Sequence, residues 1–363
     1  IKRSKNKVYI IAEAGGAHFG SLLKGKELID LAKKSGADAV KFQTYRSDLI
    51  CADDTNRAPY QIKNKHKQSQ LDMLKQYELS YDDFRILNNY AKCKNIDFIT
   101  TVADKSDIHF ITNDLKLKFI KVGSSDLSNV QLLLHLGKTN KKILLSTGMS
   151  NIDKINLALS ALAYGNKNNN FNFDMIKDRN YYRKNIQYIN KKVSLFHCTT
   201  EYPAPLNELN LNVIDTFNDL YNMDIGYSDH SGVSITPIIA SAKNIKYIEV
   251  HVTKSNKMTG PDHSSSLNIP NFKKYVQLIR KSELALGSST KKLTVSEKKN
   301  HKHIIKRLFL RKNISSGQIL NDDFIACKRS NTGLSADKYS SIINKTVKKD
   351  LRKGSKIFLK DLI

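Results

Sequence analysis

Short apolar runs recur along the chain, and most are followed by a segment with helical periodicity. Between the first two runs, residues 21–37 repeat Leu and Ile at helical spacing and stop at Gly36, a residue suited to a helix C-terminus. Near-continuous apolar strands that alternate with helices indicate a parallel sheet covered on both faces, and eight such units favour a closed (β/α)8 TIM barrel. The predicted strands are 8–13, 39–43, 97–101, 118–122, 142–146, 193–197, 224–228 and 247–251.

Three later stretches depart from this alternation of predicted strands and helices. Residues 165–192 are rich in Asn, Lys and Tyr, and we interpret them as an insertion before the sixth strand. Residues 288–303 are polar and charged, which is typical of a linker. Residues 304–363 contain two segments of the form basic-apolar-Gly-apolar-Asp-apolar, which predict a small, turn-rich β domain. We therefore expect a barrel domain over 1–287, a linker and a second domain.

Composition narrows the class of protein. Apolar residues make up 40% of the 363 positions, which indicates a globular chain. The net charge is +26, but the lysines are spread along the whole sequence and form no stripe, so we do not expect nucleic-acid binding. Such a charge would still attract a small anionic substrate.

The sequence shows no signal for a membrane or an oxidising compartment. No segment approaches 18 consecutive apolar residues, and the first apolar run is short and ends at Glu13, unlike a signal peptide. The four cysteines form no CxxC pair, so neither a disulfide framework nor a thiolate zinc site is indicated. We expect a cytoplasmic protein without a membrane partner.

Two histidines follow the last two predicted strands. His230 lies in GYSDHS and His251 in IEVHVT. In a (β/α)8 barrel, functional residues lie at the carboxyl ends of strands, and imidazole is a common ligand of first-row metals. The pair therefore predicts a divalent metal. Asp262, in the loop that follows, would orient a metal-bound water or a ligand histidine, or would cap a helix.

Two lysines lie inside predicted buried strands. Lys41 and Lys121 each need an anion nearby, because an unpaired buried charge is costly. That anion is either a substrate phosphate or carboxylate, or a neighbouring acidic side chain. Hydroxyl groups that could join it are Thr101, Ser124 and Ser146. Glu13 ends the first strand and is either a general base or sugar-hydroxyl acceptor, or a carboxylate that fixes the glycine-rich turn after it.

Taken in order, these motifs resemble the sialic acid (N-acetylneuraminate) synthase family, including legionaminic and pseudaminic acid synthases. The resemblance runs from about residue 8 to the C-terminus. Its carriers are AE-x-G-x-x-H-x-G, KFQ, K-x-G-S, STGMS, HCT-x-x-YP-x-P, G-x-SDH, E-x-H, GPD and a tail like the antifreeze-like (SAF) domain.

The resemblance implies a transferase that condenses phosphoenolpyruvate with an N-acetylated hexose to a nine-carbon 2-keto acid and phosphate. It implies a domain-swapped homodimer and a metal on His230 and His251, Mn²⁺ with Mg²⁺ or Co²⁺ as alternatives. Phosphoenolpyruvate would contact Lys41, Lys121, Thr101, Ser124, Ser146 and Ser228, with Glu13 at the reacting centre. The sugar would contact Gln43, Asp126, Thr200, Tyr202, Asp262 and, from the SAF domain of the partner, Arg329.

Some positions depart from the family pattern. Ala17 replaces an Asn, Asp126 stands where Glu is frequent, Thr200 replaces Ser or Asn, and Ser330-Asn331 replaces Pro-Gly. These changes bear on which sugar is used. They leave two alternatives open: a non-catalytic carbohydrate-binding relative, and another phosphoenolpyruvate-using keto-acid synthase.

Overall fold

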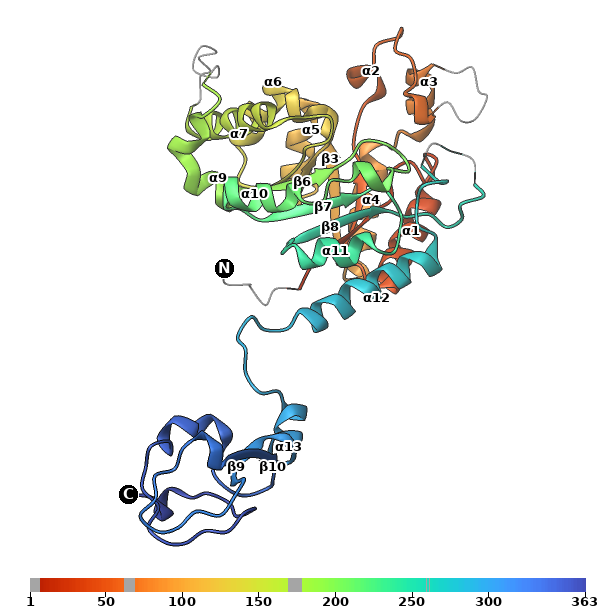
Figure 1. Cartoon of the computed structure of the whole chain (residues 1–363). Coiled ribbons are helices and arrows are strands. Elements are labelled where there is room, and N and C mark those ends of the chain that lie inside the picture. Colours follow the sequence, from red (N-terminus) through yellow and green to blue (C-terminus); the bar gives the residue numbers. More distant parts are fainter. Residues whose placement is uncertain (1–6, 62–68, 169–177, 259, 261) are drawn as a thin grey trace. The chain divides into compact units, whose positions relative to one another are not determined.

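Eight parallel strands close into a barrel in the order β1 to β8 (Figure 1). The computed structural model describes residues 7–61, 69–168, 178–258, 260 and 262–363. All eight predicted strands are present, and so the predicted TIM barrel is confirmed. The strands are β1 Tyr9–Glu13, β2 Ala39–Gln43, β3 Asp97–Val102, β4 Phe119–Val122, β5 Lys142–Ser146, β6 Val193–Cys198, β7 Ile225–Asp229 and β8 Tyr247–His251.

Helices surround the barrel, and their ends follow local sequence signals. Helix α1 begins after Ser21, whose hydroxyl accepts a bond from the Lys24 amide, and ends at Gly36 with a φ of 90°. The other helices of this unit are α2 Ser47–Ile50, α3 Gln70–Tyr77, α4 Tyr81–Cys93, α5 Lys105–His109, α6 Val130–Gly137, α7 Ile152–Lys167, α9 Ile186–Lys192, α10 Val213–Tyr221, α11 Thr236–Ala242 and α12 Ile269–Leu286.

Two apolar layers hold the barrel together. The larger lies between the strands and the helices and includes Leu28, Phe84, Leu133 and Phe272, all at most 3% exposed. A smaller cluster fills the barrel interior, where alternate residues of each strand point inward. Its members are Ile11, Ala39, Ile99, Phe119, Leu144, Phe196 and Tyr247.

The segment 165–192 was expected to be an insertion before β6, and its later part is packed against the barrel unit. Residues 169–177 lie outside the described residues, but α7 extends to Lys167 and α9 occupies Ile186–Lys192. Tyr182 and Ile189 are buried in the barrel core. The later part of the segment therefore provides a packed helix of the barrel unit.

The chain divides into two compact units, Ile1–Gly287 and Ser288–Ile363. In the second unit β9 (Lys306–Leu310) pairs antiparallel with β10 (Ile325–Arg329), as expected for a small β domain. Its own core includes Leu308, Leu310, Ile342 and Ile357. The predicted linker also contains helix α13, Val295–Ile304, which begins with a capping box.

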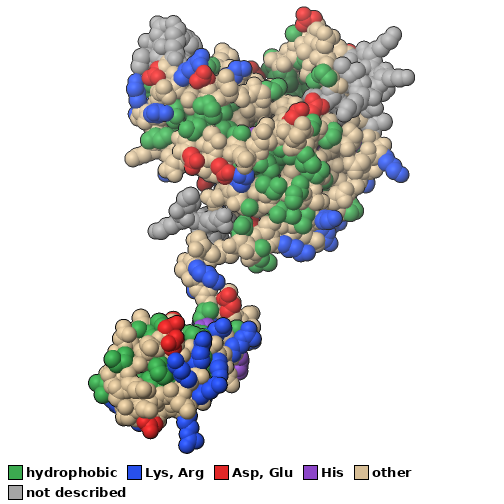
Figure 2. Space-filling model, viewed as in Figure 1, with side chains coloured by type: hydrophobic (Ala, Val, Ile, Leu, Met, Phe, Trp, Pro, Cys, Tyr) green, Lys and Arg blue, Asp and Glu red, His purple; other side chains and the backbone are tan. Residues whose placement is uncertain are grey.

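Surface charge differs between the units on the face drawn in Figure 2. Lys and Arg side chains are dispersed over the barrel unit among acidic residues, and they gather more densely on the second unit. Exposed cations there include Lys306, Lys328 and Arg329. Among the described residues, no helix is long and apolar enough to cross a membrane.

Candidate active site

A layer of polar side chains lies directly above the apolar interior of the barrel. Alternate residues of a strand point to the same side, so residues two positions beyond the interior cluster also face inward. The strand register brings them level: Glu13 is opposite both Lys41 and His251, and Thr101 is opposite Lys121. This layer contains Glu13, Lys41, Thr101, Lys121, Ser146 and Glu249.

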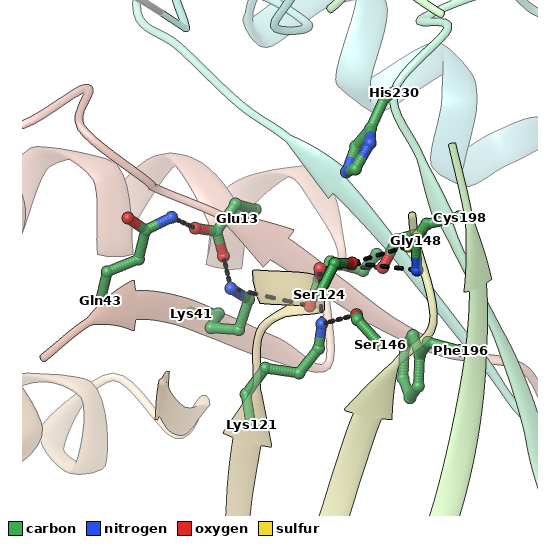
Figure 3. Close-up of polar contacts among 12 residues, drawn as sticks. Glu13, Lys41, Gln43, Lys121, Ser124, Ser146, Gly148, Phe196, Cys198 and His230 are labelled. Atoms are coloured by element: carbon green, nitrogen blue, oxygen red, sulfur yellow. Dashed lines mark hydrogen bonds and ion pairs between the residues drawn. The ribbon is translucent and has the colours of Figure 1, made fainter. Parts of the chain in front are cut away.

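Lys41 and Lys121 are each paired with a buried carboxylate. Glu13 forms an ion pair with Lys41 through Oε2 and accepts a 2.9 Å bond from Gln43 through Oε1 (Figure 3). Lys121 donates to Ser146 Oγ at 2.6 Å and to Glu249 Oε1 at 3.2 Å. All four charged side chains are at most 5% exposed. We call Glu13, Lys41, Lys121 and Glu249 the charge cluster.

Glu249 connects the two lysines. Its Oε1 also accepts a 3.0 Å bond from Ser228, and its Oε2 lies 3.9 Å from Lys41 Nζ. Burial by itself would raise the pKa of Glu249, but Lys121 and Lys41 hold it at about 2. Burial would likewise lower the pKa of Lys41, yet Glu13 and Glu249 outweigh it and the pKa is raised. Both Glu249 and Lys41 are therefore held in their charged forms.

A group of closely packed polar atoms lies at Gly148, at the ends of β5 and β6. Ser124 Oγ accepts a 3.1 Å bond from the Gly148 amide and lies 3.3 Å from Cys198 Sγ (Figure 3). A methyl group added at Gly148 would lie 2.2 Å from Thr200 Oγ1 and 2.8 Å from Ser124 Oγ. The glycine is therefore needed to leave room for these polar atoms.

The two predicted metal ligands lie side by side. The rings of His230 and His251 are 5.6 Å apart between centroids, and the ring of Tyr202 packs 4.2 Å from His230. His230 Nδ1 donates to the Thr199 carbonyl at 2.6 Å, which leaves the lone pair on Nε2. Burial and the neighbouring His251 lower the pKa of His230 to about 3, so this ring is neutral.

Asp262 approaches this pair from the loop after β8. Its Oδ2 accepts a 3.1 Å bond from the Gly16 amide and lies 4.0 Å from His251 Nδ1. A side chain at Gly15 would come within 2.8 Å of Asp262 and 3.2 Å of the His251 ring, and the φ of Gly15 is 47°. The glycine-rich turn therefore permits this close approach.

These residues fit a divalent metal bound through two imidazoles. His251 Nδ1 is buried and has no hydrogen-bond partner among the described residues, and the lone pair on His230 Nε2 meets only a long 3.4 Å contact from the Tyr202 hydroxyl. Among the described residues, no three His, Cys, Asp or Glu side chains gather at metal-binding distance. Other ligands would therefore be oxygens of water or substrate.

His230 is fixed from behind by a buried carboxylate that the sequence did not single out. Asp229 accepts hydrogen bonds from the Ser231 amide and hydroxyl at 2.9 and 2.6 Å, from Thr236, and from Tyr275 at 2.7 Å. The turn that carries His230 is thereby tied to α11 and α12.

The other predicted site residues lie in three places. Thr101 is half-buried at the end of β3, opposite Gln43 and Lys121. Asp126 lies in a short 3₁₀ turn, where it accepts bonds from Ser125 and Asn129. Arg329 is exposed on β10 of the second unit. The structure thus groups the predicted residues of the barrel domain, with Asp126 beside the group.

Sequence reasoning assigned no role to Glu249, Gly148 or Cys198. For Glu249 a signal was present, because a glutamate inside a fully buried strand requires a cation. For Gly148 and Cys198 no local signal exists, because their contacts come from other strands. His197, which also lies on β6, has a structural contact instead, with Nε2 2.7 Å from the Leu209 carbonyl.

Comparison with known proteins identifies similar chains along almost the whole length. Residues 28–291 match the NeuB family and residues 307–363 match the SAF domain. N,N'-diacetyllegionaminic acid synthases of Campylobacter jejuni and Legionella pneumophila are 36% and 32% identical, covering 97% and 96% of this chain and 99% and 92% of their own. The crystal structure of N-acetylneuraminic acid synthetase from Leptospira borgpetersenii superposes with a TM-score of 0.65 at 26% identity, covering 82% of this chain and 92% of the other.

Proposed function

The chain belongs to the NeuB family, and we propose that it is a nonulosonic acid synthase that joins phosphoenolpyruvate to an N-acetylated hexose. The observation that carries the proposal is the charge cluster beside the His230–His251 pair, at the strand ends where barrels of this fold have their active sites. Two ammonium groups are available for an anionic substrate, and two imidazoles for a metal.

Phosphoenolpyruvate carries a phosphate and a carboxylate, and both groups need cations and hydrogen-bond donors. Lys41 and Lys121 supply the charge, and Ser146 and Ser228 already bond to members of the charge cluster. The polar atoms packed at Gly148 add the hydroxyl of Ser124. We place phosphoenolpyruvate across these groups, with its C3 towards the histidine pair.

The sugar would enter as its open-chain aldehyde, over Tyr202, Gln43 and Asp262. His230 and His251 would hold a divalent metal, which supplies Lewis-acid polarisation of the aldehyde carbonyl. The ring of Tyr202 packs against His230, so the sugar carbonyl would approach the two imidazoles along the face of the Tyr202 ring. Arg329 of the second unit would add donors for the N-acetyl group, within a homodimer.

The reaction then proceeds in two bond-forming steps. The C2=C3 π electrons of phosphoenolpyruvate attack the aldehyde carbon; a C–C bond forms, the C=O π bond breaks, and the aldehyde oxygen takes up a proton to become a hydroxyl. Water adds at the cationic C2 and releases a proton, and the C2–O bond to phosphate then breaks as the new C2 hydroxyl loses its proton to give the 2-keto acid. Glu13, held by Lys41 and Gln43, faces the cluster and would accept the hydrogen bond of the attacking water.

The relatives favour one class of sugar among those the pocket would admit. Both synthases described above are named for N,N'-diacetyllegionaminic acid. We therefore propose a 2,4-diacetamido-6-deoxy hexose as the substrate to test first, ahead of N-acetylmannosamine. The match to a SAF domain at residues 307–363 speaks against the alternative of another phosphoenolpyruvate-using keto-acid synthase. No described contact favours a non-catalytic carbohydrate-binding role, because Lys41, Lys121 and both histidines are retained.

The test is phosphate release from phosphoenolpyruvate with Mn²⁺ across a panel of these sugars and N-acetylmannosamine 6-phosphate. We expect release only when phosphoenolpyruvate, one sugar and the metal are present together. Release that does not depend on the sugar would contradict the proposal. Tight sugar binding without turnover across the panel would instead support the non-catalytic alternative. His230→Ala provides the control for background hydrolysis.

A further inference from the structure

Glu249 is a carboxylate in the middle of a site proposed to bind a multiply charged anion. The residue is 5% exposed, and it contacts three groups that the proposed function assigns to phosphoenolpyruvate. These contacts are 3.2 Å to Lys121 Nζ, 3.0 Å to Ser228 Oγ and 3.9 Å to Lys41 Nζ. A negative charge at this position opposes anion binding, so its presence requires an explanation.

Electrostatics explains why the two lysines need a partner before substrate arrives. An ammonium group buried without a counter-ion is strongly unfavourable, and both lysines are 3% exposed. Glu13 pairs with Lys41, and Glu249 pairs with Lys121 while approaching Lys41. Glu249 comes from β8 and Lys121 from β4, so the carboxylate spans the barrel interior to reach it.

The hydrogen bonding of Glu249 is incomplete. Its Oε1 accepts two bonds, whereas its buried Oε2 accepts none among the described residues. Glu13 Oε2 likewise has no hydrogen-bond partner among the described residues, but it forms a closer ion pair with Lys41, and Glu13 Oε1 accepts from Gln43. Glu249 lies 3.2 Å from Lys121 and 3.9 Å from Lys41, so its lysine contacts are the longer ones, and a ligand can replace them at lower cost.

We propose that Glu249 is an internal counter-ion that occupies the place of the substrate anion and gives up its lysine contacts when phosphoenolpyruvate binds. This inference rests on the proposed function, because it assumes that the lysines receive phosphoenolpyruvate. It makes Glu249 a positioning residue: it holds Lys121 and Ser228 in place in the free protein and limits the affinity for anions.

Replacing the charge while keeping the shape tests this role. In Glu249→Gln the amide oxygen can still accept from Lys121 and Ser228, but the cluster gains one net positive charge. We expect the dissociation constants for phosphoenolpyruvate and for inorganic phosphate to fall by at least about tenfold, or about 1.4 kcal/mol. Calorimetry on the whole chain, with a chelator and no added metal, measures both constants without depending on turnover.

Two matched variants separate the effect of the Glu249 charge from any role of its side chain in holding neighbouring residues in place. Glu249→Asp keeps the charge but shortens the side chain, so neither anion should bind more tightly. Glu283→Gln makes the same change in net charge at the far end of the barrel, where Glu283 pairs with Arg280 at 2.9 Å and accepts from the Val8 amide. It should leave both dissociation constants unchanged. If Glu249 only holds neighbouring side chains in place, Glu249→Gln should instead bind both anions more weakly.

The outcomes distinguish this inference from the proposed function. If the wild-type protein binds phosphoenolpyruvate and Glu249→Gln binds it equally or more weakly, the counter-ion role is refuted and the proposed function stands. If the wild-type protein binds neither phosphoenolpyruvate nor phosphate, the anion site and the proposed function both fail. A Glu249→Gln variant that folds only in phosphate supports the inference, since an external anion then replaces the carboxylate. One that folds in neither condition refutes it.

Discussion

Gly148 offers a direct test of the polar atoms packed at the ends of β5 and β6. Its backbone conformation needs no glycine, because its φ is not positive, so an alanine there acts only through the space it fills. The added Cβ would lie 2.2 Å from Thr200 Oγ1, 2.8 Å from Ser124 Oγ and 3.2 Å from Cys198 Sγ. The first two distances are shorter than any stable contact, so Thr200 and Ser124 must move.

The size of the effect follows from what those movements break. Overpacking a well-packed site costs about 1–3 kcal/mol, and about 2–4 °C of melting temperature per kcal/mol is typical for domains of this size. Ser124 Oγ would also lose its 3.1 Å bond from the Gly148 amide and its position towards an anion. A hydrogen bond to a charged group contributes about 1.5–3 kcal/mol, so the affinity for phosphoenolpyruvate should fall at least about tenfold.

The assay combines thermal unfolding of the whole chain with calorimetric titration of phosphoenolpyruvate. Gly123→Ala is the matched control, because a methyl group there meets nothing closer than 3.6 Å. Adding Thr200→Ala to Gly148→Ala removes the shortest contact and should restore much of the melting temperature. The reasoning would be refuted by a Gly148→Ala protein that has an unchanged melting temperature and binds phosphoenolpyruvate within about twofold of the wild-type affinity. The overpacking cost predicts a larger change in both quantities.

Further predictions concern the metal, the second unit and the turn behind the histidines. His230→Ala and His251→Ala should each abolish manganese retention, measured by elemental analysis. The affinity for phosphoenolpyruvate, measured in chelator, should change less than about threefold. Manganese retained by either variant would contradict the two-imidazole site. Chelator should stop phosphate release by the wild-type protein and Mn²⁺ should restore it; activity that persists in chelator would exclude a metal requirement. Arg329→Ala should raise KM for the sugar about tenfold and leave KM for phosphoenolpyruvate unchanged; equal effects on both would remove Arg329 from the sugar site. Asp229→Asn should lower the free energy of unfolding by about 1–3 kcal/mol in urea, because Tyr275 and the turn lose a charged acceptor; unchanged stability would show that the turn does not depend on it.

The fold could be predicted from the sequence because a strand buried on both faces appears as a continuous apolar run. All eight barrel strands carry this signal, and the ends of β1 and β8, Glu13 and His251, agree with the prediction. The packed helix in the segment 165–192 could not be predicted, for the converse reason. Only a few apolar side chains, such as Tyr182 and Ile189, anchor its later part, and they are sparse among Asn and Lys.

The site could be predicted only in part. Lysines and histidines at strand ends are visible one at a time, and the barrel fold indicates that they converge. Which carboxylate pairs with which lysine depends on barrel closure, since Lys121 and Glu249 are separated by 128 positions. The same limit applies to Gly148. Glycine is needed there because Thr200, after the end of the neighbouring strand, leaves no room for a Cβ atom.

The pairing within the charge cluster also determines what kind of ligand the site can select. Glu13 and Glu249 balance Lys41 and Lys121, so the cluster has no net charge with which to attract an anion. A ligand gains binding energy only by replacing carboxylate contacts of the lysines with its own. A molecule with two anionic groups can do so at both lysines at once, whereas inorganic phosphate offers one centre. Phosphoenolpyruvate has two such groups on a three-carbon frame, and the arrangement therefore favours it over phosphate, the product that must leave.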